Sequence, residues 1–349
     1  MSKNNSIVIW RIVFAYVIMF YHFDNKYLLT QNLPGSIGWY IGVEFFFVVS
    51  GFLLYSKLDE YRDRFSNGLS FMVNRVKRIY PIYFLAFVLC FLFIWIRDRW
   101  SLNDAVWTGG SHVFEMLALQ GAGLDMGWDY INNTGWFVSV LFISEFIIYH
   151  CLVKWKDTTE NFVLPITIIV CFSYLYRNMN GIGAASQTTG FYENWGLMRG
   201  LLDMSMGVMA ARWSKELAKK FKNTQILRLL GSVGFILVLV LSLFIGNTSL
   251  DFVYLIIISV SVAFAFLPSN SKIFDSKVIR TWSKTTLCLY LFHDMFRTSV
   301  FPIVFGYPES VKDRWVLCIV YMLTVTVFAF AVDYIYRRII ERCFAKHVE

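Results

Sequence analysis

The stretch Ile7-Val-Ile-Trp-Arg11-Ile-Val-Phe-Ala-Tyr-Val-Ile-Met-Phe-Tyr-His22-Phe23 decides the fold class. Its length and apolar character predict a helix that spans a membrane, which takes about 20 residues. Arg11 and His22 are eleven residues apart, so a helix places their side chains within roughly 20° of one another and about 16 Å apart along its axis. Ionisable groups in such a helix usually face a protein interior or a water-filled path, and this pair is therefore the first candidate for a functional site.

The composition of the whole chain agrees with a membrane protein. Hydrophobic residues make up 57% of the 349 residues and charged residues 16%, whereas soluble chains carry about 25% charged residues. The mean hydropathy is +0.54. Long apolar stretches recur with no polar domain between them, so we expect one polytopic, all-α membrane domain over residues 1–349 without a fused soluble domain.

Helix-length apolar windows predict about ten transmembrane helices. They are 6–24, 37–56, 79–96, 135–153, 161–177, 196–211, 226–245, 251–267, 283–303 and 314–336. The loops on one side (57–78, 154–160, 212–225, 268–282 and 337–349) hold 20 Lys and Arg residues, against six on the other side. The positive-inside rule therefore predicts that both termini face the cytoplasm.

The charge pattern also bears on possible ligands. A net charge of +8 would suit nucleic acid, but the cations cluster in short loops beside apolar runs, so we expect no nucleic-acid partner. The five His residues have no metal-ligand spacing, and no Walker loop or G-x-S-x-G motif is present, so no metal cofactor is expected.

Four stretches together carry a more specific pattern. They are Arg11 with His22-Phe23, Gly42-Val43-Glu44 through Ser50-Gly51-Phe52, Asn74-Arg75 through Arg78-Ile79-Tyr80-Pro81, and Ser283 through Thr286 with Tyr290-Leu291-Phe292-His293. In this order they resemble the acyltransferase-3 family of integral membrane O-acyltransferases. One departure is that Trp136 is followed by Glu145 nine positions later, whereas many members have an acidic residue about five positions after this Trp.

The resemblance implies a function. It implies transfer of an acyl group, most commonly acetyl from cytoplasmic acetyl-CoA, to a hydroxyl of an extracytoplasmic polysaccharide or lipid-linked glycan. It also implies a multi-pass protein of the bacterial cytoplasmic (inner) membrane. Two alternatives from other classes stay open: a polytopic transporter, although no internal repeat is visible, and a glycan-export accessory protein without catalysis.

Acyl transfer to a hydroxyl needs a general base, and His22 suits this role because an imidazole titrates near neutral pH. A carboxylate could fix its tautomer. Glu44 is the favoured partner because its predicted depth in the second helix matches that of His22. Asp24 and Glu145 remain alternatives. Arg11 would line the catalytic path below His22.

The donor's phosphates need cations, and Arg binds phosphate through a planar fork. We therefore expect Arg75 and Arg78, three residues apart at a predicted helix start, to bind acyl-CoA at the cytoplasmic face. Arg11 would contribute farther along the path, and His293 would support the donor site or the packing around it.

Further features have less specific roles. Other intramembrane charges are Arg199, Asp203, Asp251, Asp294, Arg297 and Asp333. Arg199 and Asp203 are four residues apart, which predicts an internal ion pair. Gly42, Ser50 and Gly51 predict close helix approach. The long outer segments 97–134 and 178–195 are expected to receive the acceptor, with a short amphipathic helix at residues 111–120.

Overall fold

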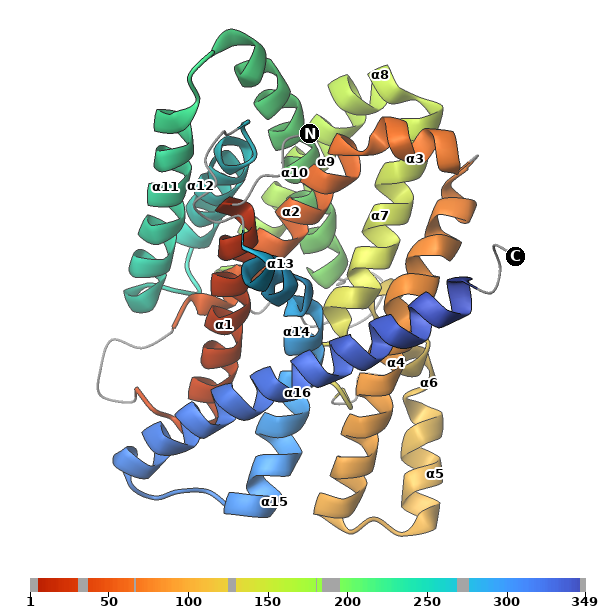
Figure 1. Ribbon diagram of the computed structural model, residues 1–349, viewed down its shortest axis with the longest axis vertical. Coiled ribbons are helices and arrows are strands. Elements are labelled where there is room, and N and C mark those ends of the chain that lie inside the picture. Colours follow the sequence, from red (N-terminus) through yellow and green to blue (C-terminus); the bar gives the residue numbers. More distant parts are fainter. Residues whose placement is uncertain are drawn as a thin grey trace.

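The computed structural model describes residues 6–30, 37–65, 67–124, 130–179, 181–183, 195–268 and 276–345. In these ranges all regular structure is helical and no β-strand occurs, which confirms the all-α prediction (Figure 1). The α-helices are α1 (Ser6–Tyr27), α2 (Gly42–Ser56), α3 (Leu58–Arg64), α4 (Gly68–Asp98), α5 (Leu102–Ser111), α6 (Val113–Met116), α7 (Trp136–Lys154), α8 (Lys156–Thr158), α9 (Leu164–Asn178), α10 (Trp195–Lys220), α11 (Gln225–Phe244), α12 (Leu250–Ala265), α13 (Lys277–Lys284), α14 (Thr286–Met295), α15 (Phe301–Phe305) and α16 (Val311–Ala345). Shorter elements are η1 (Trp39–Ile41), η2 (Gln120–Ala122) and the π-helical turns η3 (Thr159–Val163) and η5 (Phe296–Val300).

Each of the ten predicted windows holds helix, but the windows differ in character. Seven stretches within the described ranges are long and apolar enough to cross a membrane, namely Ser6–Tyr27, Trp39–Ser56, Gly68–Asp98, Trp136–Lys154, Lys156–Asn178, Gln225–Phe244 and Val311–Ile339. Helix α12 is apolar but shorter, and the predicted helix 283–303 is divided among α14, η5 and α15. The protein is thus a multi-pass helical bundle, and the count of ten crossings and the cytoplasmic termini stay predictions.

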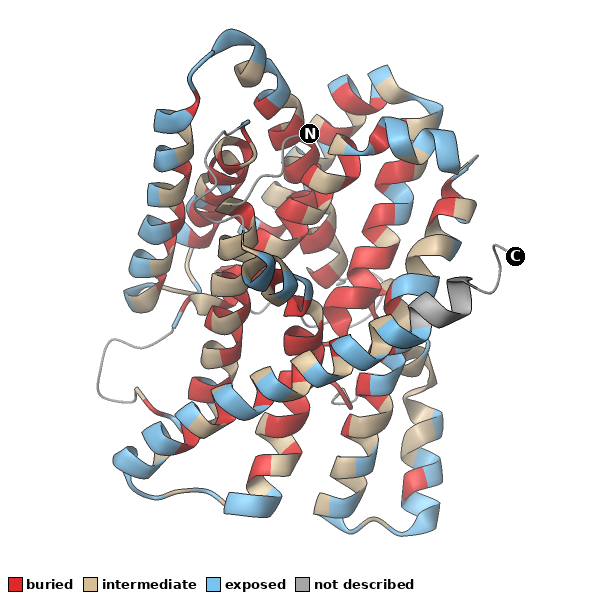
Figure 2. Cartoon of the chain, in the orientation of Figure 1, coloured by how far each residue is buried: buried red, intermediate tan, exposed pale blue. Residues whose placement is uncertain are grey.

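The bundle has an apolar exterior and a partly polar interior, as a protein surrounded by lipid requires. Exposed side chains of α11 are mainly aliphatic, such as Ile226 and Leu229, and Figure 2 shows exposed residues along the outer side of this helix. In contrast, Glu44, Arg199 and Asp203 are buried inside the bundle. Buried charge with exposed aliphatic surface is typical of a membrane domain that encloses a functional interior.

The central packing depends on glycines that let two helices touch. Helix α2 packs against α10. A Cβ atom at Gly51 would lie 2.1 Å from the Met204 carbonyl oxygen, and one at Gly207 would lie 2.1 Å from the Val48 carbonyl oxygen. Backbones this close leave no room for a methyl group, so Gly51 and Gly207 fix the spacing of α2 and α10. The predicted role of Gly51 in close helix approach is confirmed.

The outer segments differ in part from the predicted structure. A ten-residue helix, α5, lies at residues 102–111, and the amphipathic helix expected at 111–120 is reduced to the single turn α6. Ser101 caps α5 by accepting the Asp104 backbone N–H at 3.2 Å, a local signal that the apolar pattern does not contain. Residues 125–129, 180 and 184–194 of the two outer segments lie outside the described residues.

Candidate active site

A cavity of about 530 Å³ opens between α1, α2, α4, α7 and α14, and α13 and α16 each add one lining residue. Its lining includes six cations and one carboxylate: Arg11, Lys57, Arg75, Arg78, Lys284 and Arg337, with Glu145. Lys57, Arg75 and Arg78 belong to the loop region that the positive-inside rule assigns to the cytoplasm. Five separate parts of the chain thus bring positive charge to one hollow, which is an arrangement suited to a polyanion.

Arg75 and Arg78 reach this cavity because α4 begins earlier than the sequence predicted. Asn67 caps the helix: its Oδ1 accepts the Ser70 backbone N–H at 2.9 Å, and the reciprocal contact completes a capping box. The two arginines consequently lie in the second and third turns of α4 rather than at a helix start. Their spacing of three residues keeps both on one helix face, toward the cavity.

The cations differ in how they are held. Arg75 donates from Nε and Nη2 to the two Glu145 oxygens at 2.6 and 2.5 Å, and Arg337 pairs with Asp333 at 2.7 Å. In the ranges that the structure describes, Lys57, Arg78 and Lys284 have no carboxylate within salt-bridge distance. These three side chains are therefore the cations of the cavity mouth that remain available to an anionic ligand.

The predicted common face of Arg11 and His22 agrees with their placement. Arg11 lines the cavity together with Thr286 and Tyr290 of α14. The His22 ring centroid lies 5.1 Å from that of His293, which also belongs to α14. His22 thus faces α14, and Arg11 faces the cavity that α14 also lines. The cavity lining includes Tyr290, whose ring centroid is 5.8 Å from that of His293. His22 itself is not among the lining residues.

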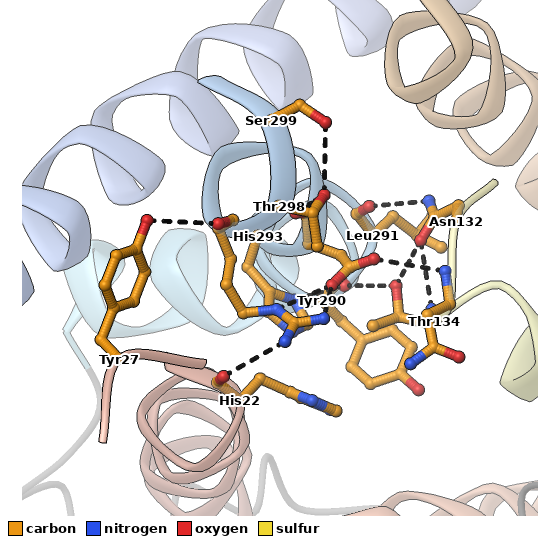
Figure 3. A network of polar contacts seen from close by, with 12 residues as sticks. His22, Tyr27, Asn132, Thr134, Tyr290, Leu291, His293, Thr298 and Ser299 are labelled. Atoms are coloured by element: carbon orange, nitrogen blue, oxygen red, sulfur yellow. Dashed lines mark hydrogen bonds and ion pairs between the residues drawn. The ribbon is translucent and has the colours of Figure 1, made fainter. Parts of the chain in front are cut away.

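The turn that follows His293 joins α14 to α1. Arg297 lies in the π-helical turn η5 and donates from Nη1 to the His22 carbonyl oxygen at 3.4 Å (Figure 3). Its Nε and Nη2 also donate to Asp294 Oδ1 at 2.9 and 2.5 Å. Isolated π turns occur frequently at functional sites. This one places Arg297 where it can hold the two histidine-bearing helices together.

The loop at residues 130–134, before α7, also binds α14. Asn132 Nδ2 donates to the Leu291 carbonyl oxygen at 3.0 Å, Thr134 Oγ1 donates to the Tyr290 carbonyl oxygen at 3.2 Å, and the Asn133 backbone N–H donates to Asp294 Oδ2 at 3.2 Å (Figure 3). Two of these bonds hold the α14 backbone just before His293, and the third holds the Asp294 side chain just after it. Sequence reasoning missed this loop, and only its polar Asn-Asn-Thr run gave a signal.

The same loop is anchored to a buried carboxyl group. Glu115 accepts the backbone N–H groups of Ile131 and Asn132 at 2.9 and 2.7 Å. Burial raises the pKa of the Glu115 carboxyl to about 8, although these two hydrogen bonds oppose the rise. Glu115 lies in α6, outside the candidate membrane spans.

The structure does not bring the favoured carboxylate to His22. Glu44 is hydrogen-bonded to Nε of Arg199, so the expected Arg199–Asp203 pair is replaced by an Arg199–Glu44 pair between α10 and α2. Neither Asp203 oxygen has a hydrogen-bond partner in the described residues. Arg199 selects Glu44 because the close α2–α10 contact places the two groups together inside the bundle.

The two alternative carboxylates also have other partners. Asp24 accepts from the Thr30 backbone N–H and hydroxyl at 3.0 and 2.6 Å, and Glu145 binds Arg75. The ion pair next to His22 is instead Asp294–Arg297, whose guanidinium donates to the His22 carbonyl oxygen. Both were visible as intramembrane charges, but sequence spacing gave no sign that the π turn after α14 would bring Arg297 to α1.

No group of three His, Cys, Asp or Glu side chains that could hold a metal ion occurs in the part of the chain that the structure describes. Comparison with curated proteins and with solved structures finds no match. The family model of the acyltransferase domain called acyltransferase-3 matches residues 4–334, nearly the whole chain. The chain therefore belongs to the acyltransferase-3 family, and it is a membrane acyltransferase by family.

Proposed function

We propose that this membrane acyltransferase moves an acetyl group from acyl-CoA to a hydroxyl of an extracytoplasmic polysaccharide or lipid-linked glycan. The observation that carries the proposal is the sequence of groups from Lys57, Arg78 and Lys284 at the cavity mouth, through Arg11 and Tyr290, to the His22–His293 pair. It offers cations for a phosphate-rich donor at one end and a base for the acceptor at the other.

The donor end follows from charge. The cavity carries six cations against one carboxylate, and the nucleotide phosphates of coenzyme A would balance this excess. The lining also includes Phe46, Phe137 and Leu141, apolar side chains suited to the pantetheine arm. Arg11 would bind the inner part of the donor, beyond the phosphates, and would line the catalytic path.

The chemical step places His22 at the acceptor. A ring nitrogen of His22 takes the proton of the acceptor hydroxyl while the hydroxyl oxygen attacks the thioester carbonyl carbon. The new C–O bond forms, the C–S bond breaks, and the proton on His22 passes to the departing thiolate of coenzyme A. No charge accumulates over the cycle, which suits a site enclosed by lipid. Asp294 and Arg297 would hold the surrounding helices in position.

The arrangement also indicates the membrane face from which each substrate enters. The donor enters from the face rich in Lys and Arg, whereas His22 lies in the last two turns of α1, toward the outer segments. The acceptor would therefore approach from the opposite face of the bacterial cytoplasmic membrane, beside the loop at residues 130–134.

The test uses purified protein, labelled acetyl-CoA and a surface polysaccharide. We expect label in the glycan together with free coenzyme A in equal amounts, and a mass increase of one acetyl group per transfer. Sealed vesicles provide the second arm. Uptake of label without acyl transfer would favour a transporter, and the absence of both activities would favour an accessory protein; either result contradicts the proposal.

A further inference from the structure

The tautomer of His293 follows from its hydrogen bonds. Nδ1 lies 2.6 Å from the Tyr290 carbonyl oxygen and 3.2 Å from that of Leu289. A carbonyl oxygen only accepts, so Nδ1 carries the hydrogen atom. Nε2 of the neutral ring is then an acceptor with a free lone pair.

This lone pair is buried and has no partner. His293 is 0% exposed, and Nε2 has no hydrogen bond to any described residue. A buried acceptor left without a hydrogen bond costs about 1–3 kcal/mol. The site is thus built to receive an N–H or O–H donor at this nitrogen.

The polar groups around His293 leave His22 as the donor within the protein. Asp294 and Arg297 bind each other, and the Tyr321 hydroxyl donates to the carbonyl oxygen of His293 itself at 3.2 Å. The His22 ring lies at 5.1 Å between centroids and is tilted by 39°. The Arg297 bond to the His22 carbonyl oxygen links the backbone of α1 to the turn that follows α14.

We infer that His293 is the positioning residue for His22: a rotation of the His22 ring, whose centroid is 5.1 Å away, brings its N–H to the free Nε2 of His293, and this hydrogen bond fixes which His22 nitrogen acts as the base. The inference rests on the proposed function, because it assigns the partner that no carboxylate supplies. His293 takes no proton in the cycle: the hydroxyl proton goes to the free nitrogen of His22 and from there to the coenzyme A thiolate. A neutral imidazole performs this task without burying another charge in the membrane.

The test compares His293→Leu, which removes the acceptor, with His293→Gln, whose side-chain oxygen restores one. His150→Leu is the matched control, since the His150 ring packs against Phe146 and Trp155 and does not line the cavity. We expect His293→Leu to lower kcat about 100-fold, the lower end of what a positioned base contributes, while the KM for acetyl-CoA changes less than twofold. The kcat of His293→Gln should be at least tenfold higher than that of His293→Leu. The kcat of His150→Leu should match that of the wild type.

Three outcomes would overturn the inference: a kcat for His293→Leu above a third of the wild-type value, equal losses for the Leu and Gln variants, or a raised donor KM at unchanged kcat. The last would instead support the donor-site role that the sequence suggested for His293. If the wild-type protein transfers no acetyl group, the proposed function itself fails, which is a separate result.

If the variants do not fold, a measurement on the wild-type protein tests the inference instead. Spectra of the protein labelled with ¹⁵N-histidine distinguish the two tautomers. We expect His293 to carry its hydrogen on Nδ1 and His22 to occupy a single tautomer. A His293 ring protonated on Nε2 at neutral charge, or a His22 ring that populates both tautomers equally, would contradict the assignment.

Discussion

Arg75 and Glu145 form a two-pronged ion pair across the donor cavity, with Nε–Oε2 and Nη2–Oε1 distances of 2.6 and 2.5 Å. Glu145 is nearly fully buried and the Arg75 side chain is 24% exposed. The guanidinium donors of Arg75 are already used by the Glu145 carboxylate. Arg75 therefore joins α4 to α7, and it has fewer donors left for a ligand. Arg75 thus has a different role from Arg78, although both belong to one sequence motif.

This pair predicts an asymmetric response to substitution. Glu145→Ala should lower the free energy of unfolding by about 3–5 kcal/mol, because it leaves a largely buried cation alone. The double variant Arg75→Met/Glu145→Leu should recover most of that loss. Thermal unfolding in detergent measures both, and a double variant as unstable as Glu145→Ala would show that the ion pair is not what Glu145 contributes.

The three unpaired cations predict where donor affinity comes from. Neutralising Lys57, Arg78 and Lys284 singly to Gln should each weaken acetyl-CoA binding about tenfold, since a hydrogen bond to a charged group is worth about 1.5–3 kcal/mol. The loss should be smaller for a donor that lacks one phosphate. Arg78→Lys should recover only part of the affinity because Lys lacks the planar fork. Binding is measured by calorimetry.

Lys77 supplies the control for that series. It is exposed and lies beside Arg78 on α4 but is not among the lining residues of the cavity. Lys77→Gln should leave donor affinity unchanged. If Lys77→Gln weakens binding as much as Arg78→Gln does, net surface charge rather than the cavity binds the donor.

The contact between α2 and α10 predicts sensitivity to one methyl group. Gly51→Ala would place Cβ against the Met204 carbonyl group, and neither backbone can move without displacing the other helix. We expect the variant to unfold at a markedly lower temperature and to lose activity with it. Gly110→Ala is the control, because a Cβ at Gly110 meets nothing within 4 Å. Equal stability of the two variants would mean that the helices separate at little cost.

Glu115 predicts a pH dependence of stability. Its folded pKa of about 8 lies above its ordinary value of 4.5. Below pH 4.5 both states hold the proton; between pH 4.5 and 8 only the folded state does, so ionisation of the unfolded state lowers stability as the pH rises. The wild type should therefore lose stability relative to Glu115→Gln from pH 5 to 8 and not beyond. Parallel unfolding curves for the two proteins across this range would contradict the assignment.

The sequence predicted the helical windows and the face shared by Arg11 and His22, because both depend on periodicity along one helix. It missed the early start of α4, which depends on the cap at Asn67. It also missed the Arg199–Glu44 and Arg75–Glu145 pairs, which depend on contacts between helices distant in the chain. The Asn132–Thr134 loop and the π turn at Arg297 were equally inaccessible, since each acts through backbone groups. Ionisable residues could thus be found from sequence, but their pairing required the packed bundle.

The most direct test of the account is the rate of acetyl transfer by His22→Ala at saturating acetyl-CoA and glycan, with donor affinity measured on the same sample. The account predicts a loss of at least 100-fold in kcat, as expected for removal of a positioned general base, with donor affinity unchanged because the cations of the cavity mouth remain. A variant that binds acetyl-CoA normally and keeps more than about a tenth of the wild-type rate, well above what that loss allows, would contradict it.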